Sequence, residues 1–265
     1  VSINDRTVKS WIANSDLYVS KEITTTSTAK PQGTFSLNAK NSLEYLRVVH
    51  QFKYFDTGIN ISAASIRFDS VEFINLYSSS SRANNVDAGI ADINKMKIAD
   101  SNFDSQFSLS FKSTRSNPQL RIKDSEFSNI SGSKGALMGF STSFDTVIED
   151  SRFSNITSLS GTSLIVLDPA LPINSFTMKG CKLEGNSSPE LNNIYFKKNL
   201  NNVLKLIVDS CEFRMNSSKY GAVMQIDAAI SSDSRISNSK IEDNATTISA
   251  SIYLSPNLML ADTLG

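Results

Sequence analysis

The sequence of 265 residues contains one histidine, one tryptophan and two cysteines. A single histidine, His50, gives poor support to His-based catalytic pairs, multi-His zinc sites or haem ligation. No apolar run approaches the ~20 residues that a membrane-spanning helix needs. The 26 basic and 26 acidic residues cancel and form no basic cluster. The composition therefore gives no electrostatic reason to expect nucleic acid or an anionic membrane as a partner.

One motif recurs along the chain, and it is clearest in residues 119–140, QLRIKDSEFSNISGSKGALMGF. Its reference residue, called the anchor below, is Phe127. Apolar residues lie seven and five positions before the anchor and again nine and eleven positions after it. Successive anchors are 24 to 30 residues apart, at Phe73, Phe103, Phe127, Phe153, Leu183, Phe213 and Ile241. A period in this range indicates stacked supersecondary units.

The pattern inside each unit is typical of short β-strands. Apolar residues alternate with a period of two in about three short runs, which Asp-Ser, Asn and Gly interrupt, and no window shows a sustained helical period. We therefore predict an all-β parallel solenoid, with coils of about 24–30 residues and three short strands each. The anchors should form one inward column. A second column should contain Ile98, Ile122, Ile148, Met178, Val208 and Ile236.

Charged residues at outward positions support this register. Four positions before the anchor, successive units carry Lys123, Glu149, Lys179 and Asp209. Neighbouring parallel strands lie about 4.8 Å apart, so stacked residues of opposite sign attract each other. The alternation of sign is expected if the units stack in this register.

The repeat predicts one continuous domain over residues 1–265. The first coils, 1–60, are irregular, the coils of 61–255 are regular, and 256–265 begin an incomplete coil. Residues 20–33 and 77–87 are predicted to form projecting loops, and the Thr-rich middle of 20–33 allows strand character. Because the pattern restarts at Leu258 and Leu260 and stops before an anchor, we expect a segment of a longer protein. The open end of the last coil should be covered by another coil, a partner chain or a further domain.

Two stretches, FSNISGSKGALM and FRMNSSKYGAVM, combine a Phe and a nearby Asn with Gly-Ala and an aliphatic pair. They resemble the repeats of polymorphic outer-membrane adhesins. More broadly, residues 60–255 resemble the pectin-lyase-like β-helix proteins. This resemblance implies a right-handed parallel β-helix and leaves the biology open.

An Asp-Ser step recurs at Asp100-Ser101, Asp124-Ser125 and Asp150-Ser151. A column of carboxylates is one interpretation, since it would suit Ca²⁺. A turn is the other, because Asp and Ser side chains accept backbone N–H bonds where strands bend. Later units place Gly180 and Ser210 in the same slot, and these are turn residues and poor calcium ligands. The pattern favours the turn.

Glycosylation sequons occur at six asparagines: Asn60, Asn129, Asn155, Asn186, Asn216 and Asn244. All but Asn60 fall two or three residues past an anchor, at the same turn. There the asparagines could carry glycans, or they could stack inward as a hydrogen-bonded ladder that excludes glycans. The sequence leaves both interpretations open.

The two cysteines, Cys181 and Cys211, occupy one frame position in adjacent units, two residues before the anchor. Stacking would bring their Cα atoms to the interstrand distance, which lies within the range for a disulfide. Two buried free thiols side by side are the alternative, and the sequence does not decide between them.

The sequence presents no clustered Asp pair of the kind that polysaccharide-cleaving β-helices use. We therefore expect a non-enzymatic structural or adhesive segment of a large extracellular or cell-surface protein, without catalytic residues, cofactor or metal. Its expected partners are proteins, further copies at the solenoid ends, or glycans, and neither nucleic acid nor an inserted membrane. The alternatives are a carbohydrate-active lyase or hydrolase, and an intracellular filament or organelle scaffold.

Overall fold

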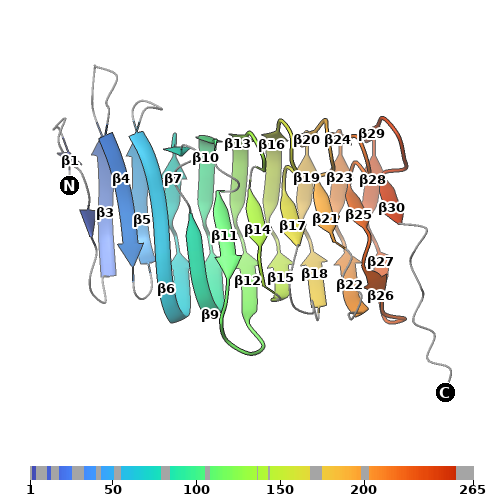
Figure 1. The fold of residues 1–265 in the computed structure, drawn as a ribbon, viewed down its shortest axis with the longest axis horizontal. Coiled ribbons are helices and arrows are strands. Elements are labelled where there is room, and N and C mark those ends of the chain that lie inside the picture. The colour runs from blue at the N-terminus through green and yellow to red at the C-terminus, as the bar shows by residue number, and fades with distance from the viewer. Residues whose placement is uncertain are drawn as a thin grey trace.

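The computed structural model describes the backbone of residues 2–3, 11–12, 18–25, 33–39, 43–50, 55–78, 84–104, 108–135, 137–142, 144–167, 175–197 and 203–254. Within these ranges it describes side chains from Ile61 onward, Ala63 excepted. The described residues form strands, turns and bends, without a helix. Figure 1 shows the strands side by side along the long axis of the molecule. Every described pairing is parallel, so the chain forms the predicted parallel β-solenoid.

The strands stack in three faces, which we number in the order in which a coil passes through them. Face 1 contains β12 (Gln119–Lys123), β15 (Asp145–Glu149), β18 (Ser175–Lys179), β22 (Val203–Asp209), β26 (Ala229–Ile230) and β27 (Arg235–Ser237). Face 2 contains β1 (Ser2–Ile3), β3 (Tyr18–Thr25), β5 (Leu43–His50), β7 (Glu72–Ile74), β8 (Tyr77–Ser78), β10 (Lys97–Phe103), β13 (Glu126–Gly132), β16 (Arg152–Ser158), β19 (Lys182–Glu184), β20 (Ser187–Ser188), β23 (Glu212–Arg214), β24 (Ser217–Ser218), β28 (Lys240–Glu242) and β29 (Ala245–Thr246).

Face 3 contains β2 (Trp11–Ile12), β4 (Gly33–Ala39), β6 (Phe55–Asp69), β9 (Asn85–Asn94), β11 (Leu109–Lys112), β14 (Met138–Phe140), β17 (Ile165–Leu167), β21 (Ile194–Phe196), β25 (Met224–Ile226) and β30 (Ile252–Leu254). The long strands β6 and β9 continue from face 3 into face 1 of the next coil. Strands of residues 1–60 pair in parallel with the later ones, so the same ladder extends into that part of the chain.

The core consists of inward side chains that stack in register from coil to coil. The anchor column on face 2 is Phe73, Ile98, Phe127, Phe153, Leu183, Phe213 and Ile241. The main column on face 1 is Phe68, Ile93, Ile122, Ile148, Met178, Val208 and Ile236. The inward column on face 3 contains Val86, Phe111, Phe140, Leu167, Phe196, Ile226 and Leu254. Before the last described coil, each of these side chains is at most 3% exposed.

The predicted register is wrong in the coil of Phe103. Phe103 was expected in the anchor column and Ile98 in the face 1 column, but Ile98 pairs with both Phe73 and Phe127. Phe103 instead lies five residues further on, in register with Ser78 and Gly132. It is still buried, because its two small neighbours leave room for an aromatic ring. The irregular unit around Leu43, where the repeat pattern would place an anchor at Leu43 itself, shows the same slip: Leu43 pairs with Phe68 of face 1, and Val48, five residues on, pairs with Phe73.

Each coil turns two corners of face 2 with a residue at positive φ. The first corner lies three residues before the anchor, at Ser70, Lys95, Asp124, Asp150, Gly180, Ser210 and Asn238, with φ between 49° and 63°. The second lies two residues after it, at Asn75, Asp100, Asn129, Asn155, Gly185, Met215 and Asp243, with φ between 51° and 66°. Asn, Asp and Gly dominate because they tolerate the left-handed region best. In several coils the second corner divides face 2 into two short strands, as Met215 divides β23 from β24.

The two predicted loops are partly strand, and the rest of the loop at 77–87 and the predicted last coil lie outside the described residues. Residues 20–25 belong to β3, so that stretch of the predicted loop 20–33 is strand, as its Thr-rich composition allows. Of the predicted loop 77–87, the ends are strand in β8 and β9 and residues 79–83 lie outside the described residues. The predicted incomplete coil at 256–265 also lies outside them.

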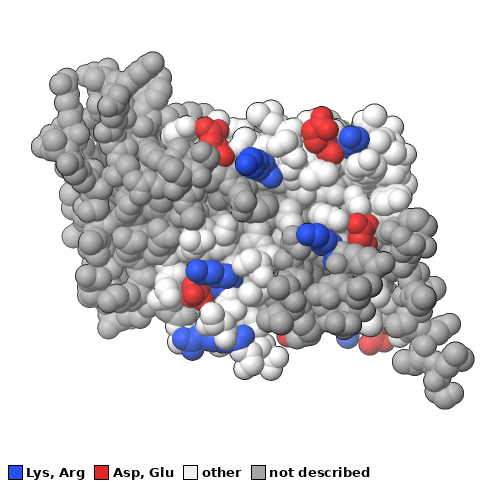
Figure 2. Space-filling model, viewed as in Figure 1, with Lys and Arg blue, Asp and Glu red and all other residues white. Residues whose placement is uncertain are grey.

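The predicted alternation of charge is confirmed on the outer surface. Lys123 pairs with Glu149, which pairs with Lys179, which pairs with Asp209. Where Arg152 and Lys182 stack with like charge, Arg152 reaches Glu184 at 3.3 Å and Lys182 reaches Glu212 at 3.5 Å. On the face seen in Figure 2, acidic and basic groups of the described residues lie near each other, and neither sign forms a patch.

Candidate functional site

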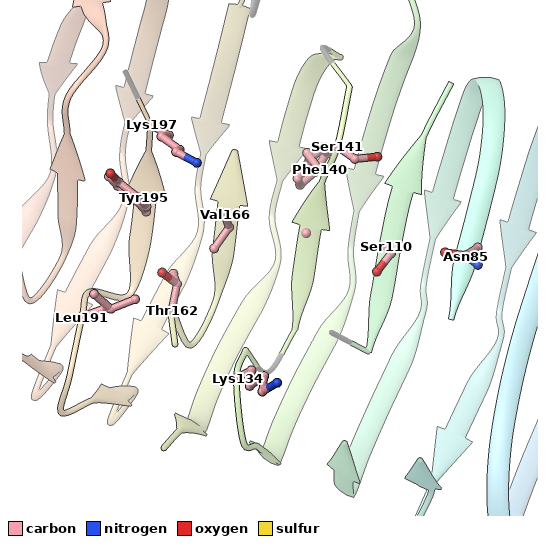
Figure 3. A pocket seen from close by; sticks show the side chains of 11 residues that line it. Asn85, Ser110, Lys134, Phe140, Ser141, Thr162, Val166, Leu191, Tyr195 and Lys197 are labelled. Carbon is pink, nitrogen blue, oxygen red and sulfur yellow. The ribbon is translucent and has the colours of Figure 1, made fainter. Parts of the chain in front are cut away.

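A groove of about 510 Å³ crosses face 3. Its floor follows one outward register position through successive strands: Asn85, Ser110, Gly139, Val166 and Tyr195. Figure 3 shows Asn85, Ser110, Val166 and Tyr195 on strands of face 3, with Lys134 and Lys197 at opposite margins of the groove. The small residues Ser110 and Gly139 lie between bulkier neighbours, and this difference in size makes the hollow.

The groove is lined by two cations and several hydroxyls, and no carboxylate of the described residues lines it. Two of the hydroxyls are already engaged, since Thr162 donates to Asn192 Oδ1 at 2.7 Å and Ser141 donates to the Phe111 carbonyl at 3.3 Å. Tyr195 donates to Asp227 Oδ2 at 2.9 Å. The exposed Lys134 at one margin could bind an anionic group, but the described lining provides no pair of carboxyl groups for acid–base work. Sequence reasoning missed this groove, although small outward residues in register could have indicated it.

The Asp-Ser steps form turns. Asp100, Asp124 and Asp150 all have positive φ, although Asp100 lies at the second corner and the other two at the first. The serine hydroxyls point inward, and each bonds within its own turn and to the preceding coil: Ser125 Oγ donates to the Lys123 carbonyl at 2.8 Å and accepts from the Met96 N–H at 3.1 Å. Among the described residues, no group of three or more His, Cys, Asp or Glu side chains could hold a metal ion.

The sequons separate into two structural classes. Asn129 and Asn155 lie two residues after the anchor, at the second corner, and their side chains are exposed. Asn129 Nδ2 donates to Asp100 Oδ1 at 3.0 Å, and Asn155 Nδ2 donates to Asn129 Oδ1 at 3.1 Å. One amide hydrogen of each remains for other bonds, so these two sites are compatible with a glycan. Asn60 lies in β6, and its side chain is outside the described ones.

The other three sequons form an inward ladder. Asn186, Asn216 and Asn244 lie three residues after the anchor, and the first two are at most 2% exposed. Asn216 Oδ1 accepts from the Asn186 N–H at 3.1 Å and from Asn186 Nδ2 at 2.9 Å, while Asn216 Nδ2 donates to the Leu183 carbonyl at 2.9 Å. A buried amide engaged in this way has no room for a sugar. The ladder interpretation therefore suits these positions, and the glycan interpretation suits Asn129 and Asn155.

The classes predict a pattern of modification. If the chain is expressed through a eukaryotic secretory pathway, folded protein should carry glycans at Asn129 and Asn155 and none at Asn186 or Asn216. Mass spectrometry of glycopeptides, with enzymatic glycan release in ¹⁸O-labelled water, measures the occupancy of each site. Folded protein with a sugar at Asn216 would show that the ladder does not form as described.

Cys181 and Cys211 occupy the inward position, two residues before the anchor, that Ser125 and Ser151 occupy in the earlier coils. Both are free and at most 2% exposed. Cys181 Sγ donates to the Lys179 carbonyl at 3.4 Å, just as Ser151 Oγ donates to the Glu149 carbonyl at 2.7 Å. The two cysteines are neighbours, as predicted, because Cys211 lies at the same position one coil on, where Lys182 and Leu183 pair with Glu212 and Phe213. A disulfide between them stays a prediction for an oxidising compartment.

Burial should keep both thiols unreactive in the folded protein, since each is at most 2% exposed. The hydrogen bond with Cys211 and burial both raise the pKa of Cys181. The folded state therefore keeps this proton where the unfolded chain loses it, so the associated stability is present below the ordinary pKa of 9.0 and falls as pH rises above it. We expect no reaction with a thiol reagent at pH 8 and full reaction in urea, followed by absorbance. Rapid labelling without urea would contradict the burial of this pair.

No helix long and apolar enough to cross a membrane occurs among the described residues. No protein-family model, curated protein or solved structure matches this chain. The resemblance to pectin-lyase-like proteins and outer-membrane adhesins therefore extends to the parallel β-solenoid and no further. Function has to be argued from the surface of this chain itself.

Proposed function

We propose that this chain is a non-enzymatic structural or adhesive solenoid of an extracellular or cell-surface protein, which acts through its stiffness, its repeated surface and the assembly of its ends. The supporting observation is the way in which ionisable groups are used. Outward cations and carboxylates of neighbouring coils pair with each other, as Lys97 and Glu126 do at 3.6 Å and Arg214 and Asp243 at 3.7 Å. Such pairs neutralise the surface and leave little field to attract or act on a charged substrate.

Stiffness follows from the continuity of the core. The inward columns run from coil to coil without a gap among the described strands, and aromatic rings stack within them, with 5.1 Å between the ring centroids of Phe127 and Phe153. In a solenoid each coil contacts only its neighbours, so an unbroken column transmits load along the whole length. This architecture is suited to a spacer or a scaffold.

The groove on face 3 favours a second candidate, a carbohydrate-active solenoid. Glycoside hydrolysis requires two carboxyl groups about 5–10 Å apart. The described lining contains lysines and hydroxyls and no carboxylate, which supports binding of an anionic ligand better than hydrolysis. The buried free thiols are equally compatible with the third candidate, an intracellular scaffold. Thiol state and glycan occupancy in protein from its native source separate that candidate from an extracellular one.

Incubation of the full chain with acidic and neutral polysaccharides should yield no new reducing ends and no unsaturated products. The physical reason is that neither the groove nor the paired surface charges provide a converging acid and base. A reducing-end assay detects hydrolysis, and the ultraviolet absorbance of unsaturated uronides detects lyase activity. Turnover that disappears in the Lys134→Ala or Lys197→Ala variant would establish the second candidate in place of the first.

A further inference from the structure

Cys181 and Cys211 form a stacked pair of free thiols inside the solenoid. The residues that follow them, Lys182 and Glu212, pair with each other in the ladder of face 2. Both cysteines are at most 2% exposed, so both side chains lie in the core. Residues in register on adjacent parallel strands lie about 4.8 Å apart. The ladder therefore holds two sulfur atoms in one part of the core at a separation of this order.

This separation suits an atom bound between the sulfurs better than a direct bond between them. An unstrained disulfide needs Cβ atoms about 3.5–4.5 Å apart, so the two coils would have to draw together at this point. A thiolate binds zinc at about 2.3 Å, and a linear sulfur–metal–sulfur unit with bonds of this length spans about 4.6 Å. The stacked coils already provide nearly this span.

The surroundings of the pair select the class of ion. A structural zinc site needs four ligands, and the described side chains include no group of three or more His, Cys, Asp or Glu that could hold a metal. Calcium and magnesium require oxygen ligands. Soft thiolates favour Cu(I), which accepts two ligands in a line. A monovalent soft cation is therefore the ion that two sulfurs can hold alone.

Backbone N–H groups support the negative sulfurs that such an ion requires. At this inward position the side chain accepts from the preceding coil, as Ser151 Oγ does from the Ser125 N–H and Ser239 Oγ from the Cys211 N–H, both at 3.1 Å. The hydrogen bond with Cys181 lowers the pKa of Cys211, and the backbone N–H of Cys181 acts in the same direction. Hydrogen bonds to ionised acceptors are stronger than those to neutral ones.

We propose that Cys181 and Cys211 bind one monovalent soft cation, with Cu(I) as the probe, in a two-coordinate bridge between adjacent coils. Both thiols release their protons to solvent, two sulfur–metal bonds form, and no electron is transferred. Because both thiols are buried, the ion enters while these coils are still open during folding. The bridge goes beyond the proposed function, since it cross-links the solenoid from inside and uses no surface group.

Refolding of the reduced full chain in the absence of oxygen, with one equivalent of Cu(I), tests the site. We expect one ion per chain to remain after gel filtration in excess glutathione, as counted by elemental mass spectrometry. X-ray absorption at the copper edge should show two sulfur neighbours and neither nitrogen nor oxygen. The loaded protein should unfold at a urea concentration about 0.5–1 M higher than the free protein, because the ion binds the folded pair more tightly than the unfolded chain.

Cys181→Ser and Cys211→Ser are matched controls, because Ser125 and Ser151 occupy the same inward position in earlier coils. Each variant keeps one thiol and loses one of only two ligands. Its affinity for Cu(I) in competition with glutathione should therefore fall at least about a hundredfold. Circular dichroism checks that each variant folds, and the absorption spectrum of the wild type decides by itself if one does not.

Wild-type affinity for Cu(I) in either folded variant would overturn the pair as the site. A nitrogen, oxygen or third sulfur neighbour of the copper would overturn the two-coordinate bridge. Complete loss of Cu(I) from the wild type to glutathione would overturn the site as a whole.

Discussion

Substitution of Phe127 by Ala should lower the free energy of unfolding by about 3–5 kcal/mol, as truncation of a buried Phe generally does. Phe127 is fully buried, and its ring stacks on that of Phe153 with an interplanar angle of 14°. Because the column is continuous, the cavity left by the ring is bounded by Ile98 and Phe153 and cannot be filled from solvent. Urea unfolding followed by circular dichroism, with the midpoint and the slope both fitted, measures the loss.

Two controls separate this effect from a general sensitivity of the column. Phe127→Leu should cost less than about 1.5 kcal/mol, since Leu183 occupies the same column position with 2% exposure. Ile241→Ala, in the same column at the exposed end, should also cost about 1.5 kcal/mol or less, because that side chain is already 37% exposed. A cost for Phe127→Ala below about 1 kcal/mol would contradict the continuous inward column.

The sequence was sufficient to predict the columns over the regular coils because each unit there has one unambiguous anchor. From Phe127 to Ile241 the predicted and observed registers agree at every step. The alternation of charge at Lys123, Glu149 and Lys179 follows from the same register, and it was readable because the stacked positions are exposed and ionic. Fold class and register therefore came from the same periodic signal.

The register slipped at Phe103 because a coil has two similar corners. At each corner an inward residue is followed by one further residue, a residue at positive φ and a second inward residue, and the two corners are five positions apart. The stretch IADSNF at 98–103 thus matches IKDSEF at 122–127 in type, although Asp100 belongs to the second corner and Asp124 to the first. Pairing with neighbouring coils decides between these registers, and a local pattern cannot supply that information.

The sequons also show that a local motif does not determine whether a side chain is buried. A shift from two to three residues past the anchor moves the asparagine from the exposed corner at Asn155 to the buried ladder at Asn186. The motif N-x-S/T is the same in both cases, and only the backbone conformation at the corner distinguishes them. The groove was also missed, because it arises from the relative sizes of Ser110, Gly139 and Tyr195 on strands that are distant in sequence.

Asn216→Leu should lower the free energy of unfolding by about 3 kcal/mol or more, although the substitution places an apolar residue in the core. The wild-type amide satisfies the Asn186 N–H, one Asn186 Nδ2 hydrogen and the Leu183 carbonyl. All three groups are shielded from water in the variant, and each unsatisfied buried group costs about 1–3 kcal/mol. The matched control is Asn155→Gly, at an exposed corner with φ of 53° where Gly is unstrained, and its cost should stay within about 1 kcal/mol. Urea unfolding of both variants under identical conditions makes the comparison. Equal stability of Asn216→Leu and the wild type would mean that the inward amides do not hold adjacent coils together.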